Sequence, residues 1–202
     1  SYLSLSVGAQ LIINTNPHDI QTSMRQTHPT CMASVPRFWE KVYTGVKERM
    51  DSASPLQRKL FNRALEVGRK HNVQYLARRK RPPMALSLEY KLLNRTVLSM
   101  VRKQLGLENA HIFPTAGARV SPEVEEFVHA IGLNIMVGYG LTESVATVSC
   151  DHLDKPITLG SVGRIIPGLQ LKIGENNEVL LKGPTITKGY YKRESLKDRK
   201  ST

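Results

Sequence analysis

The stretch from Asn134 to Ser144, NIMVGYGLTES, most constrains how this chain of 202 residues can fold. Its short apolar run, Ile135 to Val137, follows a predicted helix that ends at Gly132, and this pattern is typical of a buried parallel strand. The Gly-Tyr-Gly turn that comes next lies at the carboxyl end of that strand, which is where α/β proteins bind ligands. The stretch therefore predicts an α/β protein with a functional loop at this point.

The residues of this loop allow two interpretations. Gly138 and Gly140 place no Cβ atoms between a flat ligand and the backbone, and Tyr139 offers a ring for stacking. Thr142 and Glu143 add a hydroxyl and a carboxylate, a pair that suits a phosphate group and its magnesium ion. In the structural alternative, Thr142 caps the next helix and Glu143 complements the helix dipole. The loop residues alone leave both interpretations open.

Four segments resemble the adenylate-forming enzymes, the superfamily of acyl-CoA synthetases, luciferases and peptide-synthetase adenylation domains, and they follow one another along the chain in the family's order. Gly138–Glu143 is one of them. Pro114–Ser121 resembles the family's small-residue loop beside the adenine and acyl sites. Glu178–Pro184 together with Gly189–Tyr191 resembles its later Gly-Tyr segment. Val35–Trp39 resembles the start of a helix in the long-chain fatty-acyl branch. The resemblance thus points to a long-chain fatty-acid CoA ligase.

The resemblance implies that ATP and a fatty acid form an acyl-adenylate, from which CoA then displaces AMP, with Mg²⁺ as the cofactor. Thr142 would bind the phosphate and Glu143 would ligate Mg²⁺, so these two are the expected catalytic residues. The implied nucleotide-binding residues are Gly117, Ala118, Gly138, Tyr139, Gly140 and Thr142. The implied acyl-binding residues are Trp39, Ala116 and Gly117. Without the resemblance, a lone Trp39 on an amphipathic helix would be interpreted as core packing.

Three family motifs have no counterpart in the sequence: the Gly-rich Ser/Thr-Gly-Lys phosphate loop, the ribose-binding Thr-Gly-Asp and the late lysine of the mobile C-terminal domain. We therefore expect an internal fragment of a longer synthetase that is inactive by itself. The alternative is a non-catalytic α/β binding module whose basic helical face recruits an anionic membrane or a nucleic acid. Acyl chain length and a homo-oligomeric state stay open.

The formal net charge of +12 is concentrated in one segment. Residues 37–103 contain 17 basic and 5 acidic residues, and Arg78–Arg81 is the densest point. The simplest interpretation is a solvated helical face. Anionic lipid headgroups or CoA are the functional alternatives, whereas nucleic acid is disfavoured because no aromatic residues are interleaved with the charges.

The expected fold is an α/β part over residues 1–155, with a mostly parallel sheet flanked by helices. Strands are expected at 9–13, 31–34, 111–113 and 135–137, and a helical insert at 36–105. The insert should contain helices that begin at Pro36, at Pro55 and near Ala85. In the last of these, Met100 should face inward and Arg102 outward. A small β-rich subdomain is expected over 156–191 and a polar tail over 192–202.

Composition limits the cellular setting. No apolar run approaches the ~20 residues that cross a bilayer. Cys31 and Cys150 have neither metal-ligand spacing nor companions, so we expect reduced thiols in the core of a cytoplasmic protein. The sequence therefore predicts a soluble protein or one peripheral to a membrane.

Overall fold

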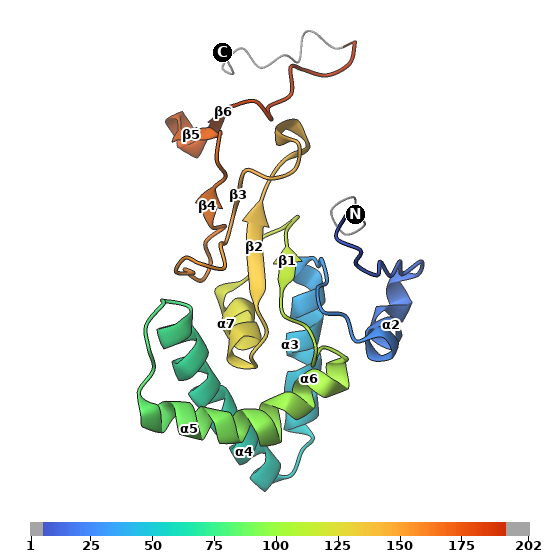
Figure 1. Ribbon diagram of the computed structural model, residues 1–202, viewed down its shortest axis with the longest axis vertical. Coiled ribbons are helices and arrows are strands. Elements are labelled where there is room, and N and C mark those ends of the chain that lie inside the picture. The colour runs from blue at the N-terminus through green and yellow to red at the C-terminus, as the bar shows by residue number, and fades with distance from the viewer. Residues whose placement is uncertain (1–5, 193–202) are drawn as a thin grey trace.

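A parallel pair of strands, β1 (Phe113–Thr115) and β2 (Ile135–Tyr139), lies at the centre of the structure, a computed structural model that describes residues 6–192 (Figure 1). The other strands are β3 (Ser149–Cys150), β4 (Arg164–Ile165), β5 (Gln170–Ile173) and β6 (Val179–Lys182). The helices are η1 (Pro17–Asp19), α2 (Ile20–Thr27), α3 (Pro36–Asp51), α4 (Pro55–Gly68), η2 (Arg69–Leu76), α5 (Met84–Leu93), η3 (Asn94–Leu98), α6 (Ser99–Leu105), α7 (Pro122–Ala130), η4 (Thr142–Ser144) and η5 (Glu175–Asn177).

The main sheet has the strand order β1-β2-β3-β4. Isolated parallel bridges join Cys31 to Ile112 and Ser34 to Thr115, whereas β3 and β4 are added antiparallel. The predicted α/β class is confirmed, and the sheet is more mixed than the mostly parallel one expected. The reason is chain length, because residues 140–148 between β2 and β3 are too few for the crossover that a parallel strand needs.

The strand expected at residues 9–13 does not form, and this prediction is wrong. Leu11, Ile12 and Ile13 are exposed and take part in no ladder. An apolar run becomes a strand only where a neighbouring strand supplies hydrogen-bond partners, and no described strand lies beside this segment. The expected strand at 31–34 is reduced to its two bridges with the β1 edge.

The helical insert begins where the sequence predicts. Pro36 starts α3, and α4 begins with a capping box in which Ser54 Oγ accepts from the backbone N–H of Gln57. Ser121 caps α7 in the same way through the N–H of Val124. These starts depend on local hydrogen bonds, so a local pattern is enough to locate them.

The last helix of the insert faces the core with other side chains than the sequence predicts. Met100, expected inward, is 57% exposed. Arg102, expected outward, is half-buried and donates to Asn94 Oδ1 at 2.8 Å and to the carbonyl of Ile131 at 2.6 Å. A π-helical turn, η3, precedes both residues and rotates the faces of the helix relative to a regular 3.6-residue period. Burial lowers the pKa of Arg102 from its usual value.

The core lies between the two central strands and the helices beside them. Phe113, Ile135 and Val137 from the strands belong to the same buried cluster as Trp39 of α3 and Val128 of α7. In Figure 1, α3 and α7 lie along β1 and β2, and α4 and α5 lie beyond the amino end of β2. The carboxyl end of β2 is therefore free of the helical insert.

The chain beyond β3 does not divide cleanly at residue 156. β4 still belongs to the main sheet, whereas β5 and β6 form a separate antiparallel pair with Leu171 opposite Leu181. The boundary of the expected β-rich subdomain stays a prediction. The expected tail at 192–202 lies outside the described residues except for Lys192.

Two further expectations concern the setting of the protein. Both cysteines are free thiols, but Cys31 is exposed and Cys150 half-buried, so the prediction that they lie in the core is wrong. Cys31 lies at the sheet edge, where its bridge with Ile112 leaves the side chain outside the packed core. Within residues 6–192, no helix has both the length and the apolar character of a membrane span.

Candidate functional site

The turn after β2 is closed by its own side chains. Ser144 is fully buried, and its Oγ donates to the carbonyl of Leu141 at 3.0 Å and accepts from the Leu141 N–H at 3.1 Å. Val145 and Ala146 then adopt positive φ angles of 52° and 78°. The sequence reasoning assigned no role to Ser144. It fixes the exit of the turn and so positions Thr142.

Position 140 requires a glycine because the backbone of Ala146 packs directly against it. A Cβ atom added there would lie 1.3 Å from the carbonyl oxygen of Ala146 and 2.4 Å from its carbonyl carbon. The sequence reasoning attributed this glycine to the approach of a ligand. The structure shows instead that the returning chain at Ala146 occupies the space.

A cavity of about 880 Å³ opens at the carboxyl ends of β1 and β2. It is lined by Ala33, Ser34, Pro114, Thr115, Ala116, Met136, Gly138, Tyr139, Gly140, Leu141, Thr142, Val145, Ala146, Thr147 and Cys150. None of these lining residues has a charged side chain, and several carry hydroxyl groups. The cavity can therefore hold a flat, mostly uncharged group by stacking and by hydrogen bonds, but its lining supplies no general base.

The structure brings together some of the predicted site residues and leaves others apart. The predicted residues that line the cavity are Ala116, Gly138, Tyr139, Gly140 and Thr142. Those that do not are Trp39, Gly117, Ala118 and Glu143. Gly117 and Ala118 are exposed on the loop that follows β1. The roles assigned to all nine residues stay predictions.

Trp39 lies behind the cavity wall. Its side chain has no exposed surface, and Nε1 donates to Ser34 Oγ at 2.8 Å and to Thr115 Oγ1 at 3.0 Å. The ring also packs edge-on against Phe113, with 4.9 Å between ring centroids. The core-packing alternative therefore describes its position, and Trp39 reaches the cavity only through the two hydroxyl residues that it holds.

Glu143 connects two of the segments that carried the family resemblance. Its carboxylate accepts a hydrogen bond from the Tyr190 hydroxyl, and its carbonyl accepts from the Thr187 N–H at 2.8 Å. The hydrogen bond from Tyr190 lowers the pKa of Glu143 from its usual value, and the same bond raises the pKa of Tyr190. Glu143 is thus ionised at neutral pH and lies one residue beyond the cavity lining.

Two buried carboxylates that the sequence reasoning did not single out accept backbone hydrogen bonds, Asp151 from β2 and Glu125 from the loop at Gly160. Asp151 Oδ2 accepts from the Val137 N–H at 2.9 Å, and Glu125 Oε2 accepts from the Gly160 N–H at 2.8 Å. Burial raises the pKa of Glu125 to about 7 and also raises that of Asp151. No local signal marks these residues, because their partners lie 14 and 35 positions away.

Glu143 is the residue to test for a magnesium site. Within residues 6–192, no group of three or more His, Cys, Asp or Glu side chains could hold a metal ion. Magnesium is usually bound by one or two carboxylates together with water and substrate phosphates. A single ionised carboxylate beside a hydroxyl-lined cavity therefore fits an ion that is bound together with a nucleotide.

Comparison with known proteins shows the family of the whole chain. Residues 1–191 match the family model described as AMP-binding enzyme. A putative fatty-acid–CoA ligase of Mycobacterium tuberculosis, fadD11, is 29% identical over 192 residues, covering 95% of this chain and 33% of that protein. The long-chain-fatty-acid–CoA ligase ACSBG2 of Rattus norvegicus is 30% identical over 179 residues, covering 85% of this chain and 26% of that protein.

Solved structures agree in fold. An o-succinylbenzoate CoA synthetase of Bacillus subtilis in complex with its acyl-adenylate intermediate aligns with a TM-score of 0.54 at 16% identity, covering 98% of this chain and 31% of that one. The same enzyme in complex with ATP and magnesium ion aligns with a TM-score of 0.52 at 15% identity, covering 96% and 31%. The chain thus spans about a quarter to a third of the length of these proteins.

Proposed function

This chain belongs to the AMP-binding enzyme family, and we propose that it forms part of an AMP-forming acid–CoA ligase that acts on long-chain fatty acids. The observation that most supports this proposal is the uncharged cavity at the carboxyl end of β2. Tyr139, Gly140, Thr142 and Ala116 all line it. The relatives whose names include fatty-acid–CoA ligase support the acid class. Because the chain spans only about a quarter to a third of their length, we further propose that it is inactive by itself.

In the proposed site the chain's own residues position ATP. The Tyr139 ring and the adjoining Gly138 backbone would flank the adenine, and the Thr142 hydroxyl would donate to a phosphate oxygen. Gly117 and Ala118 would approach the nucleotide from the loop after β1, with Ala116 and Gly117 next to the acyl carbon. The acid's own carboxylate would be the nucleophile, and the cavity lining carries no charged side chain, so positioning is its main contribution.

Glu143 would hold Mg²⁺ next to Thr142. The ion would supply positive charge that neutralises the phosphates as pyrophosphate leaves. Trp39 would act on the acyl group through Ser34 and Thr115, whose hydroxyls it orients at the cavity wall. CoA would then supply the thiol that accepts the acyl group, as the names of the relatives support.

The experiment that tests the proposed function is acid-dependent exchange of labelled pyrophosphate into ATP by the full-length protein. Exchange is expected with a long-chain acid such as palmitate, because the name of the relative from Rattus norvegicus specifies long-chain fatty acids. Acetate and free amino acids serve as matched controls at equal concentration. Exchange that responds only to acetate or to amino acids would contradict the long-chain assignment.

A second proposal concerns the outer face of the helical insert, which we propose docks on an anionic membrane surface and so places the protein at the membrane periphery. Met84, Leu88 and Leu92 recur every four residues on α5 and are 81%, 64% and 63% exposed. Lys91 lies on the same helix, and Arg78–Arg81 precede it. An exposed apolar stripe bordered by cations is complementary to an interface of anionic headgroups.

Replacing Arg78, Arg79, Lys80 and Arg81 together by Gln should weaken binding to vesicles that contain phosphatidylserine by about a hundredfold or more. Each basic residue near such a surface contributes about 1 kcal/mol. Co-sedimentation at fixed salt measures the effect, with phosphatidylcholine vesicles as the neutral control. Leu88→Ser should weaken binding to the same vesicles through the apolar stripe.

Three results would contradict the membrane proposal. The quadruple variant could sediment with anionic vesicles as well as the wild type does. It could instead lose affinity only for duplex DNA or RNA, which would favour nucleic acid as the partner. Finally, the wild type could be a dimer in sedimentation velocity that Leu88→Ser dissociates, in which case a second copy of the chain covers the stripe.

A further inference from the structure

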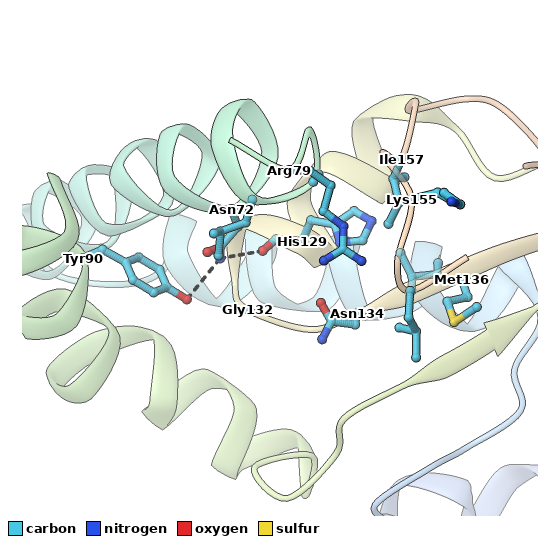
Figure 2. A pocket seen from close by; sticks show the side chains of 13 residues that line it. Asn72, Arg79, Tyr90, His129, Gly132, Asn134, Met136, Lys155 and Ile157 are labelled. Carbon is cyan, nitrogen blue, oxygen red and sulfur yellow. Dashed lines mark hydrogen bonds between the residues drawn. The ribbon is translucent and has the colours of Figure 1, made fainter. Parts of the chain in front are cut away.

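Two cavities of similar size lie outside the proposed ATP site. Figure 2 shows the smaller one, of about 350 Å³, at the amino end of β2. In it, Asn72 Nδ2 already donates to the carbonyl of His129 and to the Tyr90 hydroxyl, and the Lys155 side chain points away from Arg79. The polar groups around this cavity therefore do not converge on one ligand.

The larger cavity, of about 380 Å³, lies between α2, α3 and α6 (Figure 1). Its half-buried apolar lining residues are Ile20, Phe38, Val46, Met50 and Val101. With the buried Val42, the lining side chains from α3 recur every four residues over about three helical turns, or about 18 Å. The cavity is thus the centre of an apolar groove, to which the proposed ligase function assigns no role.

The walls of this groove are fixed by close packing between α2 and α6. Arg25 Nε donates to the carbonyl of Gln104 at 2.8 Å. A Cβ atom added at Gly106, where α6 ends, would lie 2.6 Å from the carbonyl oxygen of Met24, so the two helices touch through their backbones. The groove is therefore a built feature of the fold and not a gap between separate loops.

The groove is bordered by positive charge. Its lining includes Arg25 on α2 and both Lys41 and Arg49 on α3, and it includes no carboxylate. Within residues 6–192, none of these three cations forms an ion pair. Lys41 and Arg49 are eight residues apart on one helix, which separates them by about 12 Å along its axis. A ligand with several separated negative charges suits this arrangement better than one with a single charged head.

Gly45 lies between these two cations on α3, four residues from each. It lines the cavity, and a Cβ atom there would meet no atom within 4 Å. Glycine weakens the interior of a helix relative to alanine, so its presence here is unfavourable for α3 itself. The missing Cβ leaves room for the close approach of another backbone.

We propose that this groove binds an acidic amphipathic helix of a partner protein. Apolar side chains of the partner, spaced by three or four residues, fill the cavity, and its backbone approaches α3 at Gly45. Carboxylates on the flanks of the same helix pair with Arg25, Lys41 and Arg49. A groove about three turns long accepts the apolar anchors that helix-in-groove recognition uses.

Other occupants fit the groove less well. A membrane surface is flat, whereas the apolar lining is recessed and half-buried. Nucleic acid has no apolar face to cover this lining. A second copy of the chain lacks the required helix, because among the described α-helices only α7 has more acidic than basic residues. In α7, Glu125 is buried and Glu126 pairs with Arg69 at 3.8 Å.

The probe is a fluorescent peptide of about 18 residues, long enough to form a helix, with leucines on one face and glutamates on the others. An isomer of the same composition, with its leucines spread around the helix, is the matched control. By anisotropy with the full-length protein, the amphipathic peptide should bind at least about tenfold more tightly than the isomer. A peptide with lysine in place of glutamate should not bind measurably. Equal affinity for the two isomers would overturn the proposal.

Charge variants test whether the groove itself attracts the peptide. Lys41→Gln together with Arg49→Gln should weaken the amphipathic peptide by about tenfold or more. Arg37→Gln together with Lys47→Gln removes the same charge from the same helix outside the cavity lining, and it should change the affinity by less than about threefold. Equal losses in the two double variants would show non-specific attraction and contradict the proposal.

Gly45→Gln tests the close approach without harm to the fold. The new side chain would occupy the open space of the groove, so the amphipathic peptide should bind about tenfold more weakly. Tm should stay the same or rise, because glutamine is the better helix former. Unchanged peptide affinity would overturn the proposal.

Two further results with this variant would assign the groove to another occupant and so contradict the proposal. A lower Tm for the full-length variant would show that another segment of the same protein fills the groove. A wild-type dimer that the variant dissociates in sedimentation velocity would show that a second copy fills it.

Discussion

Glu143→Gln in the full-length protein should reduce acid-dependent pyrophosphate exchange by about a hundredfold at limiting magnesium while the fold stays intact. The amide has nearly the shape of the carboxylate but is a poor ligand for Mg²⁺, so the proposed ion would bind weakly. The loss of charge stabilisation on the leaving phosphates would then lower the rate. Exchange assays at fixed palmitate and ATP measure the effect, and circular dichroism verifies the fold.

Tyr190→Phe is the matched control for this variant. It removes the hydroxyl that donates to Glu143 but leaves the carboxylate free to bind an ion. If Glu143 ligates Mg²⁺, the Tyr190 variant should keep most of the exchange activity. If Glu143 serves only to anchor the segment around Tyr190, both variants should lose activity to the same extent, and the metal-binding role would be wrong.

Gly140→Ala is expected to be among the most destabilising single substitutions in the chain. The new Cβ would lie 1.3 Å from the carbonyl oxygen of Ala146, so the backbone of the turn must move. Overpacking of this kind costs about 3 kcal/mol, which for a chain of this size lowers Tm by about 6 to 12 °C. Thermal unfolding of the full chain measures the shift.

Gly45→Ala provides the comparison for the Gly140 variant. Gly45 lies inside α3, and a Cβ there would meet no atom within 4 Å. Alanine should therefore stabilise the helix by up to about 1 kcal/mol through its higher helix propensity. An unchanged Tm for Gly140→Ala would show that the turn can move without loss and that its geometry is not fixed by Ala146.

Features governed by local chemistry could be read from the sequence. Pro36, Ser54 and Ser121 mark helix starts because capping involves residues only a few positions apart. The strand at Ile135 and the turn that follows it were predicted for the same reason. The family resemblance, in turn, identified Thr142 and Glu143 as candidates before any geometry was known.

Features that depend on distant partners could not be predicted in this way. The strand expected at 9–13 lacks a partner, and the apolar pattern carries no information about pairing. Arg102 turns inward because a carbonyl of Ile131 needs a donor and because a π-turn shifts the helix face. The buried carboxylates and the cavity around His129 likewise depend on contacts between segments far apart in the sequence.

The most direct test of the central claim, that the turn after β2 holds ATP and its magnesium ion, is the magnesium dependence of pyrophosphate exchange in the wild type and in Glu143→Gln. The account predicts that the variant needs at least about tenfold more Mg²⁺ for half-maximal exchange, with a lower maximal rate. Identical magnesium curves for the two folded proteins would contradict it.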